Sequence, residues 1–102
     1  MKPKEKAIIL NARDNVATAL TDLKAGTSLE LDTGDKLLTV KLTSAVPFGH
    51  KFSLAHLESG APVIKYGEVI GTATSAINKG DYVHVHNVAS TRGQSKPAGG
   101  AR

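Results

Sequence analysis

Cysteine and long apolar runs are both missing from this sequence of 102 residues. Without cysteine the chain has no disulfide, no thiolate metal site and no cysteine nucleophile. The apolar stretch at residues 7–10 is far shorter than a signal-peptide core or a membrane span. We therefore expect a cytoplasmic location and no membrane partner. The length and a hydrophobic content of 40% fit one small domain with a modest core.

Aromatic residues are also few and no basic stripe is evident, whereas both features are typical of nucleic-acid-binding surfaces. The chain has two Tyr and two Phe, so a base-stacking platform has little to build on. The formal charge of +4 lies mostly in the C-terminal tail, because residues 1–89 hold 10 Lys/Arg against 9 Asp/Glu. A phosphate-tracking surface is therefore poorly supported. We expect no nucleic-acid partner.

Several signatures of a complete active site are missing as well. The sequence has no phosphate-cradling glycine loop with its lysine, no His-Glu zinc signature and no nucleophile-elbow serine. It offers three suggestive histidines without an evident carboxylate companion. The chain is therefore expected to supply part of a site, and to be inactive alone.

Patterning in the first quarter of the chain predicts one strand and one helix. Residues 7–10 favour a short buried strand. Asp14 has the character of an N-cap, and the apolar residues behind it recur at helical spacing as far as Gly26. This spacing predicts a helix over residues 15–25.

The next segment has the pattern of a β-hairpin. Leucines at residues 29 and 31 lead into an Asp-Thr-Gly-Asp turn signal at residues 32–35. After this turn, apolar and polar residues alternate over residues 38–42. Alternation with period two places the apolar side chains on one face. We therefore predict a hairpin with one solvated face.

Glycines punctuate the chain at regular intervals. Three times an apolar residue is followed three positions later by a glycine, at Gly26, Gly60 and Gly80, and then by the start of a strand. This favours short, bent strands, so the predicted fold is mainly β with one or two short helices. The composition after Ser90 predicts a domain over residues 1–93 and a flexible tail over residues 94–102.

The segment Val-His-Val-His-Asn at residues 83–87 is the richest in chemistry-bearing side chains. If it is a strand, the side chains of His84 and His86 start about 7 Å apart on one face, which Tyr82 shares. Two imidazoles at that spacing can converge on a metal or an anionic ligand. A solvated pair, or one packing and one exposed histidine, is the commoner outcome of such spacing.

A second candidate is the loop Val-Pro-Phe-Gly-His-Lys at residues 46–51. Its proline and glycine shape a loop ending in His50 and Lys51, two groups able to meet a carboxylate. An ordinary connection between strands explains the same residues equally well. Lys65, in a predicted turn, is a possible anion contact or a solvated charge, and His56 is expected on the surface.

Four segments follow one another along the chain: Pro47-Phe48-Gly49-His50-Lys51, Val63-Ile64-Lys65-Tyr66-Gly67, Ile70-Gly71-Thr72-Ala73-Thr74 and Val83-His84-Val85-His86-Asn87. In this order they resemble a known family, the SAF domain of altronate and galactarate dehydratases. Asp-Asn-Val-Ala at residues 14–17 is also similar to an early motif of that family. The same domain occurs as a separate chain, the alpha subunit of sulfolactate sulfo-lyase.

The resemblance implies an SAF-like β-clip fold, a large dehydratase-like partner and elimination of water or sulfite from a 2-hydroxy acid. It also implies a divalent ion, Fe(II), in the assembled enzyme, and leaves homo-oligomers possible. Residues 11–13 offer no histidine, so a further ligand expected there is missing. The predicted roles are catalysis for His50 and Lys51, substrate binding for His84, Asn87 and Lys65, and metal binding for His84 and His86.

A non-catalytic binding module is the alternative interpretation. SAF-like domains also occur with sialic-acid synthases and in flagellar assembly chaperones, where the resemblance implies sugar or protein binding. Three imidazoles near one ligand favour the lyase interpretation, since a binding module has less need of them.

Overall fold

The computed structural model describes residues 6–34 and 37–90, in which the chain forms nine β-strands and no helix. No helix in these two ranges is therefore long and apolar enough to cross a membrane. The strands are β1 (Ala7–Ile8), β2 (Val16–Ala19), β3 (Ser28–Asp32), β4 (Leu37–Lys41), β5 (Lys51–Ser53), β6 (Pro62–Lys65), β7 (Glu68–Ala73), β8 (Tyr82–Val83) and β9 (Val88–Ser90).

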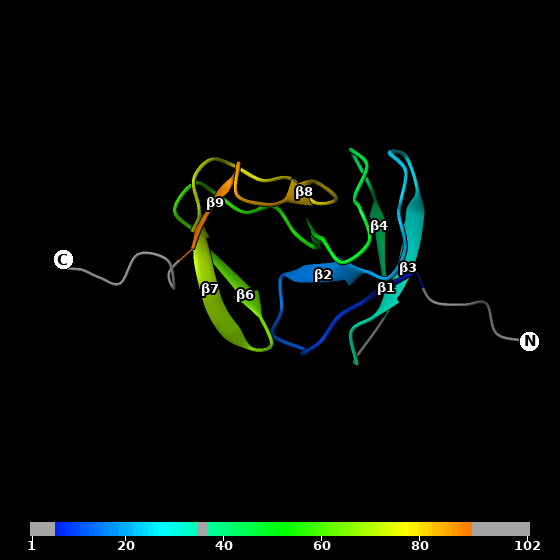
Figure 1. Cartoon of the computed structure of the whole chain (residues 1–102). Helices are drawn as coiled ribbons and strands as arrows, with labels where there is room; N and C mark the ends of the chain where they lie inside the picture. The colour runs from blue at the N-terminus through cyan, green and yellow to red at the C-terminus, as the bar shows by residue number, and fades with distance from the viewer. Residues whose placement is uncertain (1–5, 35–36, 91–102) are drawn as a thin grey trace, which may run out of the picture.

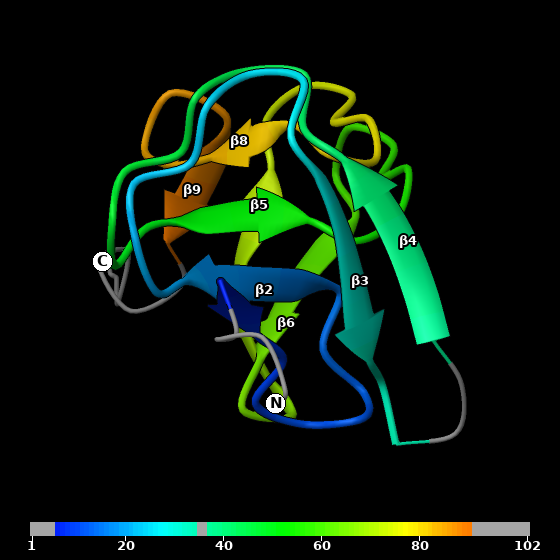
Figure 2. The same ribbon diagram turned by 90° about the vertical axis from the view of Figure 1, so that its right-hand side faces the viewer.

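The strands form three small antiparallel sheets. A four-stranded sheet in the order β1-β2-β5-β8 lies between the β3–β4 hairpin and a three-stranded sheet in the order β6-β7-β9. Figure 1 shows the hairpin at one end of the molecule and β6, β7 and β9 at the other. In Figure 2, β2, β5 and β8 lie one above another behind the hairpin. Short bent strands are thus confirmed.

Four similar turns connect these strands. Each closes with a backbone hydrogen bond between its first and fourth residues, and each has a glycine with positive φ in third place, as type II turns require. Isolated bridges join the turns in pairs, through Leu23 and Val46 and through Leu57 and Ile77. The turns are Lys24–Thr27, Pro47–His50, Glu58–Ala61 and Asn78–Asp81. The sequence pattern found three of them and missed the one that ends at His50.

The core is divided into two clusters on either side of β2. Ala17 and Ala19 belong to the cluster beneath the β3–β4 hairpin, together with Phe52. Val16 belongs to the other cluster, with Val63 and β7 residues. The alternating faces of β2 therefore serve both clusters.

The predicted helix over residues 15–25 is wrong, because β2 occupies its first half. Val16, Ala17 and Ala19 are each 1% exposed or less, so both faces of the segment are buried. Burial on both faces suits a central strand, and the helical spacing of the apolar residues is incidental. The described fold is therefore β, without the one or two short helices that the sequence predicted.

The predicted hairpin after residue 28 is confirmed, since β3 and β4 pair from Ser28 with Lys41 to Asp32 with Leu37. Val40 and Leu42 are buried, as the alternation requires. The predicted strand at residues 7–10 is shorter than expected and covers only Ala7–Ile8. The predicted tail at residues 94–102 lies outside the described residues.

Candidate functional site

Four rings gather beside the pairing of β5 with β8. The hydroxyl of Tyr82 lies 2.6 Å from Nδ1 of His50. The ring of His84 lies 4.8 Å from that of His50 and stacks on Tyr82 at 5.5 Å, with 8° between the planes. The centre of the His86 ring lies 5.6 Å from the centre of the Tyr82 ring. We call His50, Tyr82, His84 and His86 the ring cluster.

The strand register places the ring cluster. His50 closes the turn before β5, and β5 pairs with β8 so that Phe52 faces Tyr82 and Lys51 faces Val83. Phe52 is fully buried, which anchors this part of β5 in the core. Residues 32 positions apart in the sequence are thereby brought to hydrogen-bond distance.

The strand considered for residues 83–87 ends at Val83, because the chain turns back at residues 84–87, so His84 and His86 do not lie on one face of a strand. Asn87 causes this turn. Its Oδ1 accepts a hydrogen bond from the backbone N–H of His84 at 2.9 Å, and its Nδ2 donates to the carbonyl of Tyr82 at 2.8 Å. The side chain is buried, so these bonds satisfy it. Substrate contact by Asn87 stays a prediction.

A cavity of about 400 Å³ lies next to the ring cluster. It is called the lysine cavity here. His84 belongs to both, since its side chain lines the cavity and packs on the rings of His50 and Tyr82. The cavity is lined by Lys51, Lys65, Tyr66, Glu68, Ile70, Val83, His84, Val85, Val88 and Ser90.

Two ammonium groups and one carboxylate, that of Glu68, line the lysine cavity, so positive charge is in excess there. Burial lowers the pKa of Lys51, and the positive charge of Lys65 lowers that pKa further. Both effects disfavour the charged form of Lys51. An anion bound between the two lysines would pair with both charges and reverse the second effect. The cavity is therefore suited to a carboxylate.

Tyr66 at the tip of the β6–β7 hairpin forms one wall of this cavity. Tyr66 and Gly67 have φ angles of 58° and 75°, the two positive values of a type I′ turn. Tyrosine rarely adopts this conformation, which disfavours it by about 1 kcal/mol. The Nζ atom of Lys65 lies 5.4 Å from the centre of the Tyr66 ring, a cation–π distance. The predicted turn is confirmed.

Asp14 and Asn15 hold this hairpin in place, instead of starting a helix. Asn15 donates from Nδ2 to the carbonyl of Pro62 at 2.9 Å and accepts at Oδ1 from the N–H of Ile64 at 2.8 Å. Oδ1 of Asp14 accepts from the N–H of Gly67 at 2.8 Å. Sequence reasoning missed this role, because partners about 50 residues away leave no local signal.

A family model describes most of the chain. Residues 5–91 match the altronate/galactarate dehydratase SAF domain. The chain belongs to this family. The resemblance drawn from its motifs is thereby confirmed, and the ring cluster and lysine cavity are features of an SAF domain.

Curated relatives include both whole enzymes and a separate subunit. The SAF domain is 48% identical to altronate dehydratase of Escherichia coli over 80 residues, which are 78% of this chain and 15% of that protein. It is 40% identical to the (2R)-sulfolactate sulfo-lyase subunit alpha of Chromohalobacter salexigens over 57% of this chain and 62% of that subunit. The corresponding subunit of Paracoccus pantotrophus is 41% identical, over 60% of this chain and 88% of that subunit.

The SAF domain does not assemble a metal site from the residues that the structure describes. No group of three or more His, Cys, Asp or Glu side chains gathers there in an arrangement that could hold an ion. His86 is exposed and His84 is half-buried, and each packs on Tyr82. A divalent ion would therefore need ligands from outside residues 6–34 and 37–90.

His56 lies apart from the ring cluster, as the sequence predicts. Its Nε2 lies 2.9 Å from Glu58 and its Nδ1 2.9 Å from Asn78. The hydrogen bond with Glu58, and then that with Asn78, raises the pKa of His56. The side chain is half exposed, at 50%. This histidine braces two neighbouring loops and provides an internal control for the others.

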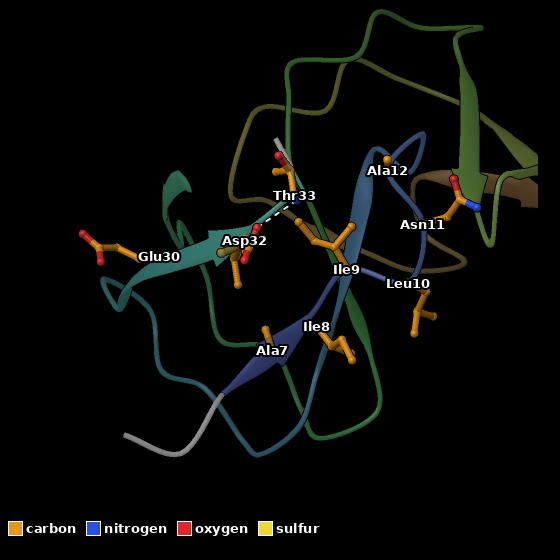
Figure 3. A pocket seen from close by; sticks show the side chains of 11 residues that line it. Ala7, Ile8, Ile9, Leu10, Asn11, Ala12, Glu30, Asp32 and Thr33 are labelled. Carbon is orange, nitrogen blue, oxygen red and sulfur yellow. Dashed lines mark hydrogen bonds between the residues drawn. The ribbon is translucent and has the colours of Figure 1, made fainter. Parts of the chain in front are cut away.

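A second cavity, of about 440 Å³, lies between the N-terminal segment and β3. Its lining includes the apolar side chains of residues 7–10 and the acidic residues Glu30 and Asp32. Figure 3 shows Asp32 beside Ile9, with the side chain of Glu30 extending away from the other labelled residues. We call it the acidic cavity. It has neither lysine nor histidine among its described lining residues.

Proposed function

We propose that this SAF domain is the small component of a lyase that eliminates water or sulfite from a 2-hydroxy carboxylate. The observation that carries the proposal is the lysine cavity, where Lys51 and Lys65 meet His84 of the ring cluster. Cations, an imidazole and an apolar wall in one cavity fit a small hydroxy acid. The names of the relatives point to altronate, galactarate or sulfolactate as the substrate.

The residues have distinct roles in this proposal. Lys51 neutralises the carboxylate, and His50 acts as acid or base beside it. Loss of the α-proton generates an enediolate, whose charge Lys51 stabilises, while a general acid assists the departing β-group. Lys65, His84 and Asn87 are proposed substrate contacts. Burial and the charge of Lys65 favour the neutral form of Lys51, and a bound carboxylate would favour the charged form again.

A large dehydratase-like chain is the proposed partner, because this domain spans only 15% of the altronate dehydratase that it matches. The subunit name of the sulfolactate sulfo-lyase relatives points to a multi-subunit enzyme as well. His84 and His86 are proposed as two ligands of a divalent ion, Fe(II), whose other ligands the partner supplies. A cytoplasmic location is part of the same proposal.

The test is to recover the tagged chain from the cells that encode it and identify what remains bound in stoichiometric amount. The proposal predicts a large dehydratase-like protein, and a complex that converts sulfolactate, altronate or galactarate. Recovery of a lone stable domain, with no turnover of any of the three acids, would instead support a binding module.

A further inference from the structure

The contact between Tyr82 and His50 carries information about where the imidazole holds its proton. The phenol oxygen and Nδ1 lie 2.6 Å apart in a half-buried position. A neutral imidazole has one N–H and one bare nitrogen, so a hydrogen bond at Nδ1 decides what the other nitrogen can do. If Nδ1 accepts from the phenol, the ring proton is on Nε2.

The chemistry of the two groups favours this direction. A phenol is a better donor than acceptor, and a bare imidazole nitrogen is a strong acceptor. The short separation is typical of an O–H donor, since N–H donors to oxygen usually lie 2.7–3.2 Å from it. Among residues 6–34 and 37–90, the hydroxyl of Tyr82 has no other hydrogen-bond partner that would take its proton.

The surroundings hold the two rings in this relation. Tyr82 is fixed by β-pairing with Phe52 and by stacking on His84 with 8° between the planes. The ring of His50 is further confined by His84 at 4.8 Å. Nε2 of His50 points away from the phenol and has no hydrogen-bond partner among residues 6–34 and 37–90. It is left for a ligand.

We infer that Tyr82 is a positioning residue that keeps the proton of His50 on Nε2, so that His50 donates a hydrogen bond to a ligand oxygen. The identity of the ligand rests on the proposed function, and the position of the proton on His50 does not. A neutral His50 in this state cannot take the α-proton at Nε2. In the proposed elimination, His50 then donates a hydrogen bond to the leaving group or to the carboxylate. Another residue acts as the base that takes the α-proton.

The experiment measures the ring nitrogens directly. In the full-length ¹⁵N-labelled chain at mildly alkaline pH, where imidazoles are neutral, long-range ¹H–¹⁵N spectra report which nitrogen of His50 is protonated. The expected result is a proton on Nε2 and a slowly exchanging Tyr82 hydroxyl proton. In Tyr82→Phe, which keeps the stacked ring, the Nδ1 resonance shifts to that of an unbonded acceptor and some Nδ1–H form appears.

Tyr66→Phe is the matched control, because it removes the hydroxyl of the chain's other tyrosine without touching His50. His56 provides an internal reference in both variants. A proton on Nδ1 in the wild type overturns the inference, as does an Nδ1 resonance that Tyr82→Phe leaves unchanged.

Turnover by the assembled enzyme tests the consequence. Tyr82→Phe is expected to lower kcat about tenfold with little change in KM, the size of one lost positioning hydrogen bond. Unchanged turnover would overturn the donor role. If the proton is on Nε2 but the complex converts no hydroxy acid, the proposed function fails and the proton position stands.

Discussion

Two cavities in the described part of this SAF domain are similar in size and opposite in charge. The acidic cavity, of about 440 Å³, has Glu30 and Asp32 in its lining, and the lysine cavity, of about 400 Å³, has Lys51 and Lys65 against the single carboxylate of Glu68. Only the second adjoins a cluster of imidazoles. A carboxylate ligand is repelled by the first and attracted by the second.

The comparison shows that the chemistry of the lining side chains, and not the cavity volume, distinguishes the candidate site. The acidic cavity is similar in volume, but its charged groups come from β3 alone and the N-terminal segment opposite supplies apolar side chains and the uncharged Asn11. The lysine cavity gathers residues from β5 through β9 and from the turns that follow β6 and β8. Convergence of polar groups from several elements is typical of a functional site.

Removal of His86, a member of the ring cluster beside the lysine cavity, has the largest expected effect. His86→Ala is expected to lower turnover by about 10² or more, as for loss of a metal ligand or acid–base group. The chain should remain folded, because His86 is exposed. Steady-state turnover and thermal unfolding give the two readouts. His56→Ala is the control, and a fully active His86→Ala enzyme would exclude the role proposed for this residue.

Removal of Asn15 should loosen the lysine cavity and leave the acidic one intact. Asn15→Ala leaves the carbonyl of Pro62 and the N–H of Ile64 without their partner, which destabilises the chain by about 1–3 kcal/mol. Asn11→Ala, at the acidic cavity, removes one exposed hydrogen bond to Arg13 and should change stability by less than about 0.5 kcal/mol. Chemical denaturation measures both, and equal losses would contradict the distinction.

Lys51→Met is expected to stabilise the free domain slightly. The folded-state pKa of Lys51 is below its usual value, so the folded state disfavours the charge at neutral pH. Solvent screening of this half-exposed group keeps the gain within about 0.5 kcal/mol. Between the pKa of Lys51 in the folded state and its higher pKa in the unfolded state, the unfolded chain binds more protons. The stability of the wild type therefore rises with pH in this range. The stability gained by Lys51→Met falls to zero as the pH approaches the usual pKa of lysine.

Thermal unfolding at neutral and alkaline pH checks this prediction, with exposed Lys41→Met as the control. A melting temperature of Lys51→Met below that of the wild type at neutral pH would contradict it. So would a gain that is larger at alkaline pH.

The hairpin of β3 and β4 was predictable because its information is local. Alternating leucines and an Asp-Thr-Gly-Asp turn specify it within about 15 residues. β2 was not predictable, since its strand state depends on burial between two clusters whose other members lie far along the chain. Propensity and spacing alone favoured a helix there.

The candidate site was predictable in its residue types and not in its geometry. Family motifs named His50, Lys51, Lys65 and His84, and the structure brings these residues to one end of β5. The role of Tyr82 depends on the β5–β8 register, and Asn87 bends the chain where alternation predicted a strand. Side-chain hydrogen bonds to a distant backbone have no sequence period, so patterning misses them.

The most direct test compares two double variants in the assembled enzyme. Lys51→Met with Lys65→Met removes the cations of the lysine cavity, and Glu30→Gln with Asp32→Asn removes the charges of the acidic cavity. KM for the hydroxy acid should rise at least about tenfold in the first, because a charged partner of a carboxylate is lost. It should change less than about twofold in the second. A KM that rises only in the second would contradict the assignment of the lysine cavity as the site.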